Sequence, residues 1–211
     1  MNTLLKVLTA SGGVGAVSAG AYFVIPSKKD MSIRAQLKKS GYFILNLDQK
    51  DTTHKEEWEK IKTAYGKEAE DLLRFSNVVK DTSNTISGIK DACASLLSSE
   101  SRKAEDLEKA RRWCVVPVTV ASRLGNKLAL LDTTTTNADD ALWAEKLKEH
   151  QKENSKWTKI PNAWGTGDTD DGKKKTALKT KCGDMAKLNT FDKDFETFVS
   201  YTRDWCTKSK D

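Results

Sequence analysis

The sequence predicts an all-α protein, with an N-terminal membrane helix or signal segment and a helical ectodomain of two similar three-helix units. The 211 residues include only three prolines, and 37% hydrophobic against 31% charged residues is ordinary for a helical domain that buries a core. Tryptophan and cysteine also recur in one order. The two copies are Trp58, Cys93, Trp113-Cys114 and then Trp143, Cys182, Trp205-Cys206. Such a recurrence indicates one helical unit built twice.

The predicted boundaries place a signal-anchor or transmembrane segment at residues 1–27 and a tether at 28–50. The two helical units follow at 51–131 and 132–211. The units match in order but not in length, since 35 positions separate Trp58 from Cys93. In the second unit the corresponding distance, from Trp143 to residue 182, is 39 positions. Loops absorb such differences at small cost, because the entropy of loop closure grows slowly with length.

The N-terminal segment is unlike the rest of the chain. No charge occurs from Val7 to Ile25, and these 19 residues, at about 1.5 Å each, nearly span a ~30 Å hydrocarbon core. An uncleaved anchor helix fits this run. A signal peptide also fits, with Lys6 as its charged start and Ala19-Gly20-Ala21 as its cleavage site. A buried, glycine-rich helix of a cytosolic protein is the third interpretation, although such a run is rare in so polar a chain.

Two observations oppose each other on the side of the membrane at which the domain lies. Four lysines follow the apolar run and only Lys6 and the amino group precede it, so the positive-inside rule alone would keep the domain inside. The signal-like layout and the disulfide interpretation given below point outward. We therefore expect a cell-membrane protein with an extracellular ectodomain.

A short basic helix is predicted after the apolar segment. It lies between Lys28 and Lys39, with Ile33 and Leu37 on one side, and Gly41 ends it. The apolar run 42–45 then predicts a strand or an extended tether.

The first helical unit is expected to begin at a capping box. Thr53 is a candidate N-cap, and Glu56 follows it three residues later. The helix that follows carries Trp58, Ile61 and Tyr65 on one face, at the i, i+3, i+7 spacing.

Two further helices complete the first unit. The second helix carries apolar residues at the same spacing: Ile86, Ile89, Cys93 and Leu96. Residues 98–101 predict a turn, and the third helix runs from about Ala104 to Cys114. Pro117 ends it, because proline disfavours helix in the residue before it.

The second half of the chain opens with an apolar bridging segment, 118–131, expected to be helical after Thr119. Residues 133–136 predict a linker, and Asn137 is a good N-cap for a helix that carries Trp143 and Leu147. Glycine, proline and aspartate gather in 155–172, which predicts a long surface loop.

Two helices close the chain. The first lies around Cys182. The second has the clearest apolar stripe of the sequence, in steps of four and three: Phe191, Phe195, Phe198, Thr202 and Trp205. We expect this stripe to be the main hydrophobic anchor of the C-terminal unit.

The four cysteines admit three interpretations. Disulfides fit an even number of cysteines in an exported domain. A structural zinc site usually has cysteines about two to four residues apart, and no such pair occurs. Buried free thiols in a cytosolic protein are the third. Pairing within each unit, Cys93 with Cys114 and Cys182 with Cys206, is the simplest of the three connectivities.

Helix geometry speaks against this pairing if the hairpin turns near Ser99. Cys93 would then lie about six residues before the turn and Cys114 about fifteen after it, an offset of roughly 13 Å at 1.5 Å per residue. A disulfide needs Cα atoms within about 7 Å. The pairing therefore requires a broad turn centred nearer Lys103.

The remaining polar residues indicate surface rather than chemistry. His54 and His150 are expected at the surface in the end turns of helices, and we expect no catalytic, cofactor-binding or metal-binding residue. Arg111-Arg112 and Lys173-Lys174-Lys175 are short charge runs, expected on solvated helix faces. The net charge of +6 arises from interspersed residues, with lysine well above arginine, so no nucleic-acid partner is expected.

Three features resemble the uncharacterised paralogous protein families of haemotropic mycoplasmas. They are the apolar N-terminal segment, the Trp-x-x-Ile-x-x-x-Tyr helix at Trp58, and the Cys … Trp-Cys-Val-Val-Pro-Val-Thr-Val pattern of Cys93 and Trp113 to Val120. The resemblance covers most of the chain, and the Trp-Cys-x-x-Pro-x-Thr-Val block is its most specific part. It implies a variable, membrane-anchored protein for which surface exposure is suspected, and it offers no catalytic residue.

We therefore expect a membrane-anchored, surface-exposed, non-catalytic protein that acts as an adhesin-like or variable antigenic module. It would contact the membrane through its N-terminal segment and need no cofactor, while the sequence indicates neither a host or protein partner nor an oligomeric state. Two alternatives remain open. One is an exported enzyme with an unrecognised site, and the other is a cytosolic helical scaffold with free thiols.

Overall fold

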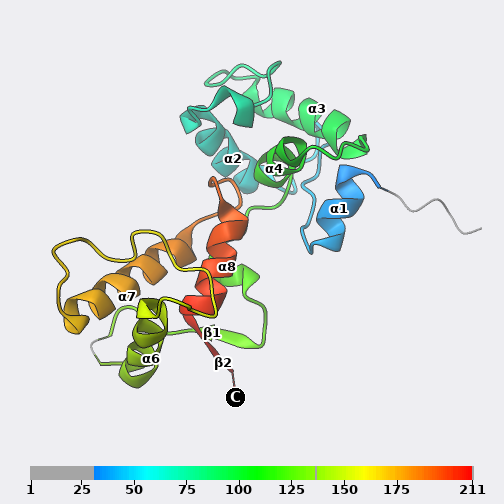
Figure 1. The fold of residues 1–211 in the computed structure, drawn as a ribbon. Coiled ribbons are helices and arrows are strands. Elements are labelled where there is room, and N and C mark those ends of the chain that lie inside the picture. The colour runs from blue at the N-terminus through cyan, green and yellow to red at the C-terminus, as the bar shows by residue number, and fades with distance from the viewer. Residues whose placement is uncertain (1–30, 136, 211) are drawn as a thin grey trace, which may run out of the picture. The chain divides into compact units, whose positions relative to one another are not determined.

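The computed structural model describes residues 31–135 and 137–210. Within these ranges the chain is mostly helical, with eight α-helices and a single two-stranded sheet (Figure 1). No helix in these ranges is both long enough and apolar enough to cross a membrane. The predicted membrane or signal segment, residues 1–27, lies outside the described residues. We refer to residues 31–117 as the first half and to residues 118–210 as the second half.

The first half contains four α-helices and a 3-10 turn: α1 (Ile33–Lys39), α2 (Lys55–Lys67), η1 (Asp71–Leu73), α3 (Thr85–Ser98) and α4 (Ala104–Trp113). The predicted short basic helix is confirmed as α1, which buries Ile33 and Leu37. The predicted apolar face of α2 is also confirmed. An extended segment between α1 and α2 forms a single bridge from Ile44 to Val115.

The second half contains four α-helices and two strands: α5 (Val120–Arg123), β1 (Leu128–Leu130), α6 (Asp140–Gln151), α7 (Asp171–Lys187), α8 (Phe195–Trp205) and β2 (Thr207–Ser209). The prediction of a helical bridge over 118–131 is right for one turn, α5, and wrong for the residues that follow it. Gly125, at φ +77°, follows the short α5, and the chain then extends into β1. β1 pairs antiparallel with β2.

Three helices begin later than predicted. At α2 the capping box does not form, because the carboxylate of Asp51 accepts the N–H of Thr53 at 2.6 Å. This local bond competes with the helix, which starts at Lys55 after an N-cap His54 that makes no side-chain cap. α6 starts after Asp139 rather than Asn137, and both of these residues have positive φ. α8 starts at Phe195, so Phe191 precedes it.

Apolar side chains gather in two clusters. The first is built around α1 to α4 and includes Trp58, Tyr65 and Trp113. The second lies among β1, α6, α7 and α8 and includes Trp143 and Trp205. The four tryptophans of the repeat are therefore core residues, as predicted.

Helix α8 contributes to both clusters. Phe195 and Val199, in its first turns, belong to the first cluster, whereas Trp205 at its end belongs to the second. Phe198 packs against both. The expectation that this stripe anchors the C-terminal unit is thus too narrow, because an apolar stripe that follows the helix axis can reach a different core at each end.

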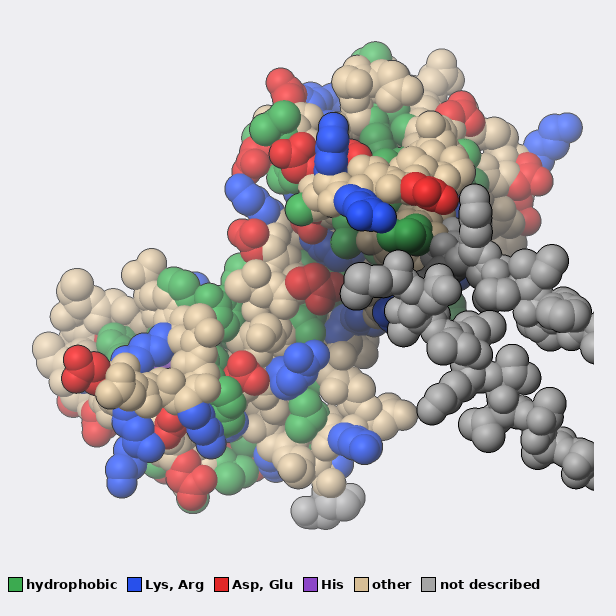
Figure 2. Space-filling view, turned by 45° about the vertical axis from the view of Figure 1, so that its right-hand side comes forward, with side chains coloured by type: hydrophobic (Ala, Val, Ile, Leu, Met, Phe, Trp, Pro, Cys, Tyr) green, Lys and Arg blue, Asp and Glu red, His purple; other side chains and the backbone are tan. Residues whose placement is uncertain are grey.

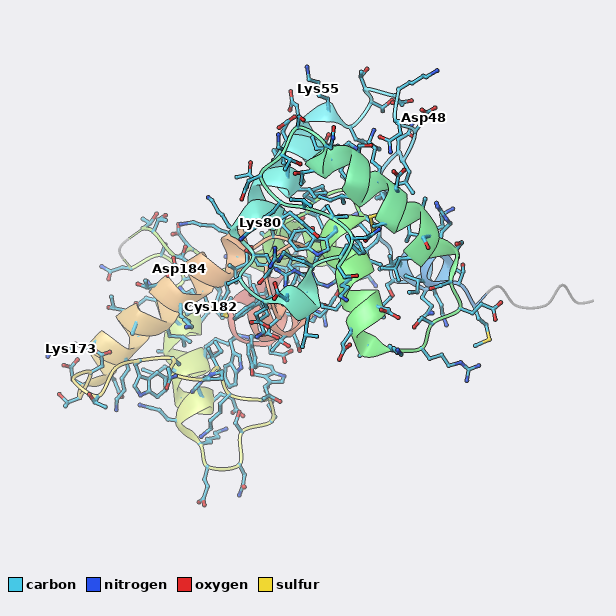
Figure 3. The ribbon with its side chains drawn as sticks, turned by 90° about the horizontal axis from the view of Figure 1, so that it is seen from above. Asp48, Lys55, Lys80, Lys173, Cys182 and Asp184 are labelled. Atoms are coloured by element: carbon cyan, nitrogen blue, oxygen red, sulfur yellow. A yellow bond between two sulfur atoms is a disulfide. The ribbon has the colours of Figure 1, made fainter. Side chains whose placement is uncertain are left out.

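Both cysteine pairs form disulfides, Cys93 with Cys114 and Cys182 with Cys206, each with Cα atoms 5.6 Å apart. None of the four cysteines, all of them described, is free. The turn between α3 and α4 spans residues 99–103, so it is as broad as the pairing requires. In the second half, Cys182 lies in the C-terminal part of α7, well along from Lys173 near its start (Figure 3).

The four buried tryptophans make the same kind of contact in each half. Every indole Nε1 donates a hydrogen bond to a backbone carbonyl, at 2.6 to 3.2 Å. The acceptors are Asn46 for Trp58, Leu73 for Trp113, Asp132 for Trp143 and Thr158 for Trp205. In each half, the first tryptophan thus binds the segment that precedes its own helix, α2 or α6. The second tryptophan binds the segment that follows the helix of the first.

A backbone contact next to each disulfide also recurs. Leu45 donates its N–H to the carbonyl of Cys114 at 3.1 Å, and Leu131 donates to the carbonyl of Cys206 at 2.9 Å. In both halves the strand-like segment before the tryptophan helix therefore lies against the cysteine that follows the last helix.

Candidate functional site

The two histidines are both hydrogen-bond acceptors for the backbone. Nδ1 of His54 accepts the N–H of Asn46 at 2.9 Å, and Nε2 of His150 accepts the N–H of Ile160 at 3.0 Å. The predicted surface position is wrong for His150, which is only 4% exposed. Its ring lies 4.6 Å from the ring of Trp205.

The burial of His150 follows from its place in the helix. It lies seven residues after Trp143, as Tyr65 lies seven after Trp58, and the i, i+7 spacing puts both on the tryptophan face. The hydroxyl of Tyr65 likewise accepts the N–H of the residue ten positions later, Phe75, at 2.9 Å. A histidine therefore stands where the first half has a tyrosine, and spacing from the tryptophan was the signal that would have found it.

We predict that acid weakens the fold through His150. Burial, with the positive charge of Lys159, lowers the pKa of this imidazole below its usual value. The unfolded chain then binds the proton more readily than the folded one, so stability is full above about pH 6.5, the pKa of an unfolded histidine, and falls as pH drops from there toward the folded pKa. The thermal midpoint should decrease when the pH is lowered from 7.5 to 5.5, and it should decrease by less in His150→Tyr.

A reciprocal variant serves as the control for this prediction. Tyr65→His places an imidazole at the matching position of the first half, and its thermal midpoint should depend more steeply on pH than that of the wild type. If His150→Tyr keeps the full pH dependence of the wild type, the titrating group lies elsewhere.

The adjacent arginines of α4 are buried, so their predicted solvated position is wrong. Arg111 and Arg112 are 3% and 4% exposed. Arg111 is ion-paired with Glu108 and donates to the carbonyl of Thr190, whereas Arg112 is ion-paired with Glu68. Their charge alone predicted that both side chains lie in solvent. Because these side chains are long, they reach from the end of α4 to partners such as Thr190 and Glu68, which only the tertiary fold brings near.

A second polar contact joins the two halves. The hydroxyl of Tyr42 donates to the carboxylate of Glu196 on α8, and the guanidinium of Arg123 lies 4.3 Å from the centre of the Tyr42 ring. Burial and Glu196 together raise the pKa of the Tyr42 hydroxyl well above its usual value. The tyrosine therefore stays protonated and acts as a donor that fastens α8.

A cavity opens beside α2, and we call it the first groove. It has a volume of about 800 Å³ and is lined by α2, by residues 68–70 that follow it, by Arg112, and by residues 191–193. Four acidic and four basic side chains surround it, with Ala64 and Phe191 as apolar parts. Burial alone would raise the pKa of Glu68, but hydrogen bonds and the charge of Arg112 lower it. The first groove is electrically balanced.

A second cavity, the second groove, opens beside α6. It has a volume of about 500 Å³ and is lined by α6, by Lys156 and Trp157, and by the strand β2. Five lysines line it and only two glutamates. The second groove therefore carries excess positive charge.

The two grooves use the same face of the tryptophan helix in each half. The residues that line the groove in both halves lie two, five, six and nine positions after the tryptophan, Trp58 in α2 and Trp143 in α6. These are Lys60, Thr63, Ala64 and Lys67 in α2, and Glu145, Lys148, Glu149 and Lys152 in α6. The place of the groove is thus the same in both halves while its chemistry differs. The sequence did not predict either groove, since each depends on which segments the fold brings beside the helix.

Elsewhere on the surface, basic and acidic side chains are interspersed over the face seen in Figure 2. Among residues 31–135 and 137–210, no group of three or more histidine, cysteine, aspartate or glutamate side chains is arranged to hold a metal ion. Comparison with known proteins adds no relative: no family model, no curated protein and no solved structure matches the chain.

Proposed function

We propose that the chain is a membrane-anchored, surface-exposed, non-catalytic binding module of the adhesin-like or variable antigenic kind. Its ectodomain would be two copies of one disulfide-stabilised three-helix unit. Residues 1–27 would attach the module to the membrane or direct its export. The resemblance to the haemotropic mycoplasma families agrees with this proposal.

The repeated contacts support the two-copy architecture. The disulfide, both indole hydrogen bonds and the strand contact beside the second cysteine occur at corresponding places in the two halves. Loop lengths differ between the halves, whereas these contacts do not. A core kept the same around surfaces that differ is an arrangement suited to a module that varies what it binds.

The observation that carries the proposed location is the pair of fully buried disulfides. All four cysteines are 0% exposed and paired within their own half. Disulfides that form part of the core belong to oxidising compartments and are rare in reducing cytosol. This favours an ectodomain outside the cell over a cytosolic scaffold with free thiols.

The grooves favour binding over catalysis. The buried guanidinium groups of Arg111 and Arg112 are engaged in ion pairs, with Glu108 on the same helix and with Glu68 at the end of α2. His150 binds the backbone of its own loop. The grooves themselves present surface lysines and glutamates, which suit recognition of a partner by charge.

Alkylation of the native protein tests the proposed location. Cells that produce the full chain are quenched in acid, and the protein is denatured without reductant, alkylated and weighed by mass spectrometry. We expect no labelled cysteine before reduction and four after it. Four labels without reduction would contradict both the disulfides and the outward placement, and would favour the cytosolic scaffold.

A further inference from the structure

We propose that the second groove binds an acidic polypeptide segment in extended conformation, which adds a strand to the free edge of β2. This inference rests on the proposed function as a binding module and names the class of partner for one of its two grooves. Three features of the groove carry it: a half-buried lysine at a core position, a pair of cations on one indole ring, and an unpaired strand edge.

The first feature is Lys146. It is the third residue after Trp143, and the third residue after Trp58 is Ile61, which is fully buried. Lys146 is half-buried, and its Nζ donates to the backbone carbonyl of Asp204 at 2.6 Å. A charged group where the other copy has an apolar core residue lowers stability through desolvation. Such a departure from the core pattern is expected at a functional position.

The second feature is the arrangement around Trp157. Nζ of Lys146 lies 4.4 Å from the centre of one of its rings, and Nζ of Lys156 lies 4.1 Å away. Burial and then the charge of Lys156 lower the pKa of the Lys146 ammonium. The two cations repel each other on a shared aromatic surface, and a carboxylate bound between them would relieve that repulsion.

The two glutamates that line the groove, Glu145 and Glu149, do not balance its five lysines. Glu149 accepts Nζ of Lys152 at 2.5 Å and the backbone N–H of Lys156 at 3.0 Å, so its carboxylate is already engaged. Lys208 pairs with Asp139 outside the groove. Within the described part of the chain, the ammonium groups of Lys146, Lys148 and Lys156 form no ion pair, and that of Lys146 donates only to the Asp204 carbonyl. Lys156 is thus available to a carboxylate together with Lys146 beside Trp157, and Lys148 is a further free cation of the groove.

The third feature is the edge of β2. Lys210 donates its backbone N–H to the carbonyl of Lys127 at 2.9 Å. Hydrogen-bonded pairs alternate along an antiparallel ladder, so the backbone of Lys208 also faces β1. The backbone groups of Thr207 and Ser209 face the other way, along the edge of β2 that lines the second groove. An extended peptide can pair with such an edge and place alternate side chains in the groove.

The probe for this proposal is a fluorescent peptide that alternates glutamate with threonine, titrated into the full chain in a non-ionic detergent. We expect binding that weakens as salt is raised, because exposed charge pairs are screened. The variant Lys148→Gln/Lys156→Gln should bind about tenfold more weakly, or ~1.4 kcal/mol. Lys60→Gln/Lys67→Gln, the matched change in the first groove, should bind like the wild type.

The strand edge is tested by a second peptide of the same sequence with alternate amides N-methylated. It keeps every carboxylate but cannot pair with a strand, so it should bind about tenfold more weakly, or ~1.4 kcal/mol. Lys146→Ile should weaken binding and raise the thermal midpoint, because the core position becomes apolar, as it is at Ile61. If Lys146 instead stabilises the fold, Lys146→Ile should lower the thermal midpoint.

Five results would overturn the proposal. They are the absence of binding, an equal loss in the two lysine double variants, unchanged binding of the N-methylated peptide, a lowered thermal midpoint of Lys146→Ile, or a sulfated polysaccharide that binds much more tightly than the peptide. Circular dichroism of each variant checks that the fold is retained. These outcomes do not depend on the thiol measurement, so failure of the groove proposal and failure of the proposed location are distinguishable.

Discussion

Phe195→Ala is expected to lower the free energy of unfolding by about 3–5 kcal/mol, the usual cost of a buried Phe truncated to Ala. The side chain is fully buried in the first cluster, and the guanidinium of Arg111 lies 5.2 Å from the centre of its ring. Truncation leaves a cavity and removes the face on which Arg111 rests. Because a domain of this size has only ~5–15 kcal/mol of stability, the loss should be evident in a urea titration.

The control lies two residues earlier in the chain. Lys193 is paired with Glu70 in an exposed ion pair at 2.7 Å, and such pairs contribute only ~0–1 kcal/mol. Lys193→Ala should therefore leave the urea midpoint nearly unchanged. Equal, small shifts for the two variants would mean that Phe195 is not a core residue.

Removal of either disulfide is expected to lower the free energy of unfolding by about 2–5 kcal/mol. Cys93→Ala/Cys114→Ala opens a link across 21 positions, and Cys182→Ala/Cys206→Ala opens one across 24. The entropy lost on closing a loop changes slowly with its length, so the two double variants should be destabilised to nearly the same extent.

Urea titrations of the two double variants, with the wild type fully reduced as reference, measure this. The reduced wild type should be less stable than either variant, because it lacks both links. If one double variant is as stable as the oxidised wild type, that disulfide does not hold the fold together.

Much of the fold was predictable because apolar spacing determines which helix faces are buried. The tryptophan face of α2 and the short helix α1 are where the periodicity places them. The start of α2 was not predictable from a capping box, because the Asp51 carboxylate holds Thr53 in a turn. The strand β1 was missed because a three-residue strand exists only through its partner, β2.

The candidate site was much less predictable than the fold. His150 and the arginines of α4 are polar, so composition placed them in solvent. The spacing of His150 from Trp143 would have placed it on the buried face, whereas the arginines are buried against partners far away in the sequence. The sequence did not single out Lys146, which is one of several lysines in a helix rich in charge. Its contact with Trp157 required the long loop after α6, whose path no periodicity describes.

The position of Phe195 and Val199 in the first cluster has a consequence for when the chain can fold during its synthesis. Most of that cluster comes from residues 33–120, yet it is complete only when α8 has been made. A ribosome must therefore deliver nearly the whole polypeptide before the earliest part can lock into its final packing. Until α8 is made, the first cluster lacks Phe195 and Val199, so the first half cannot reach its full stability.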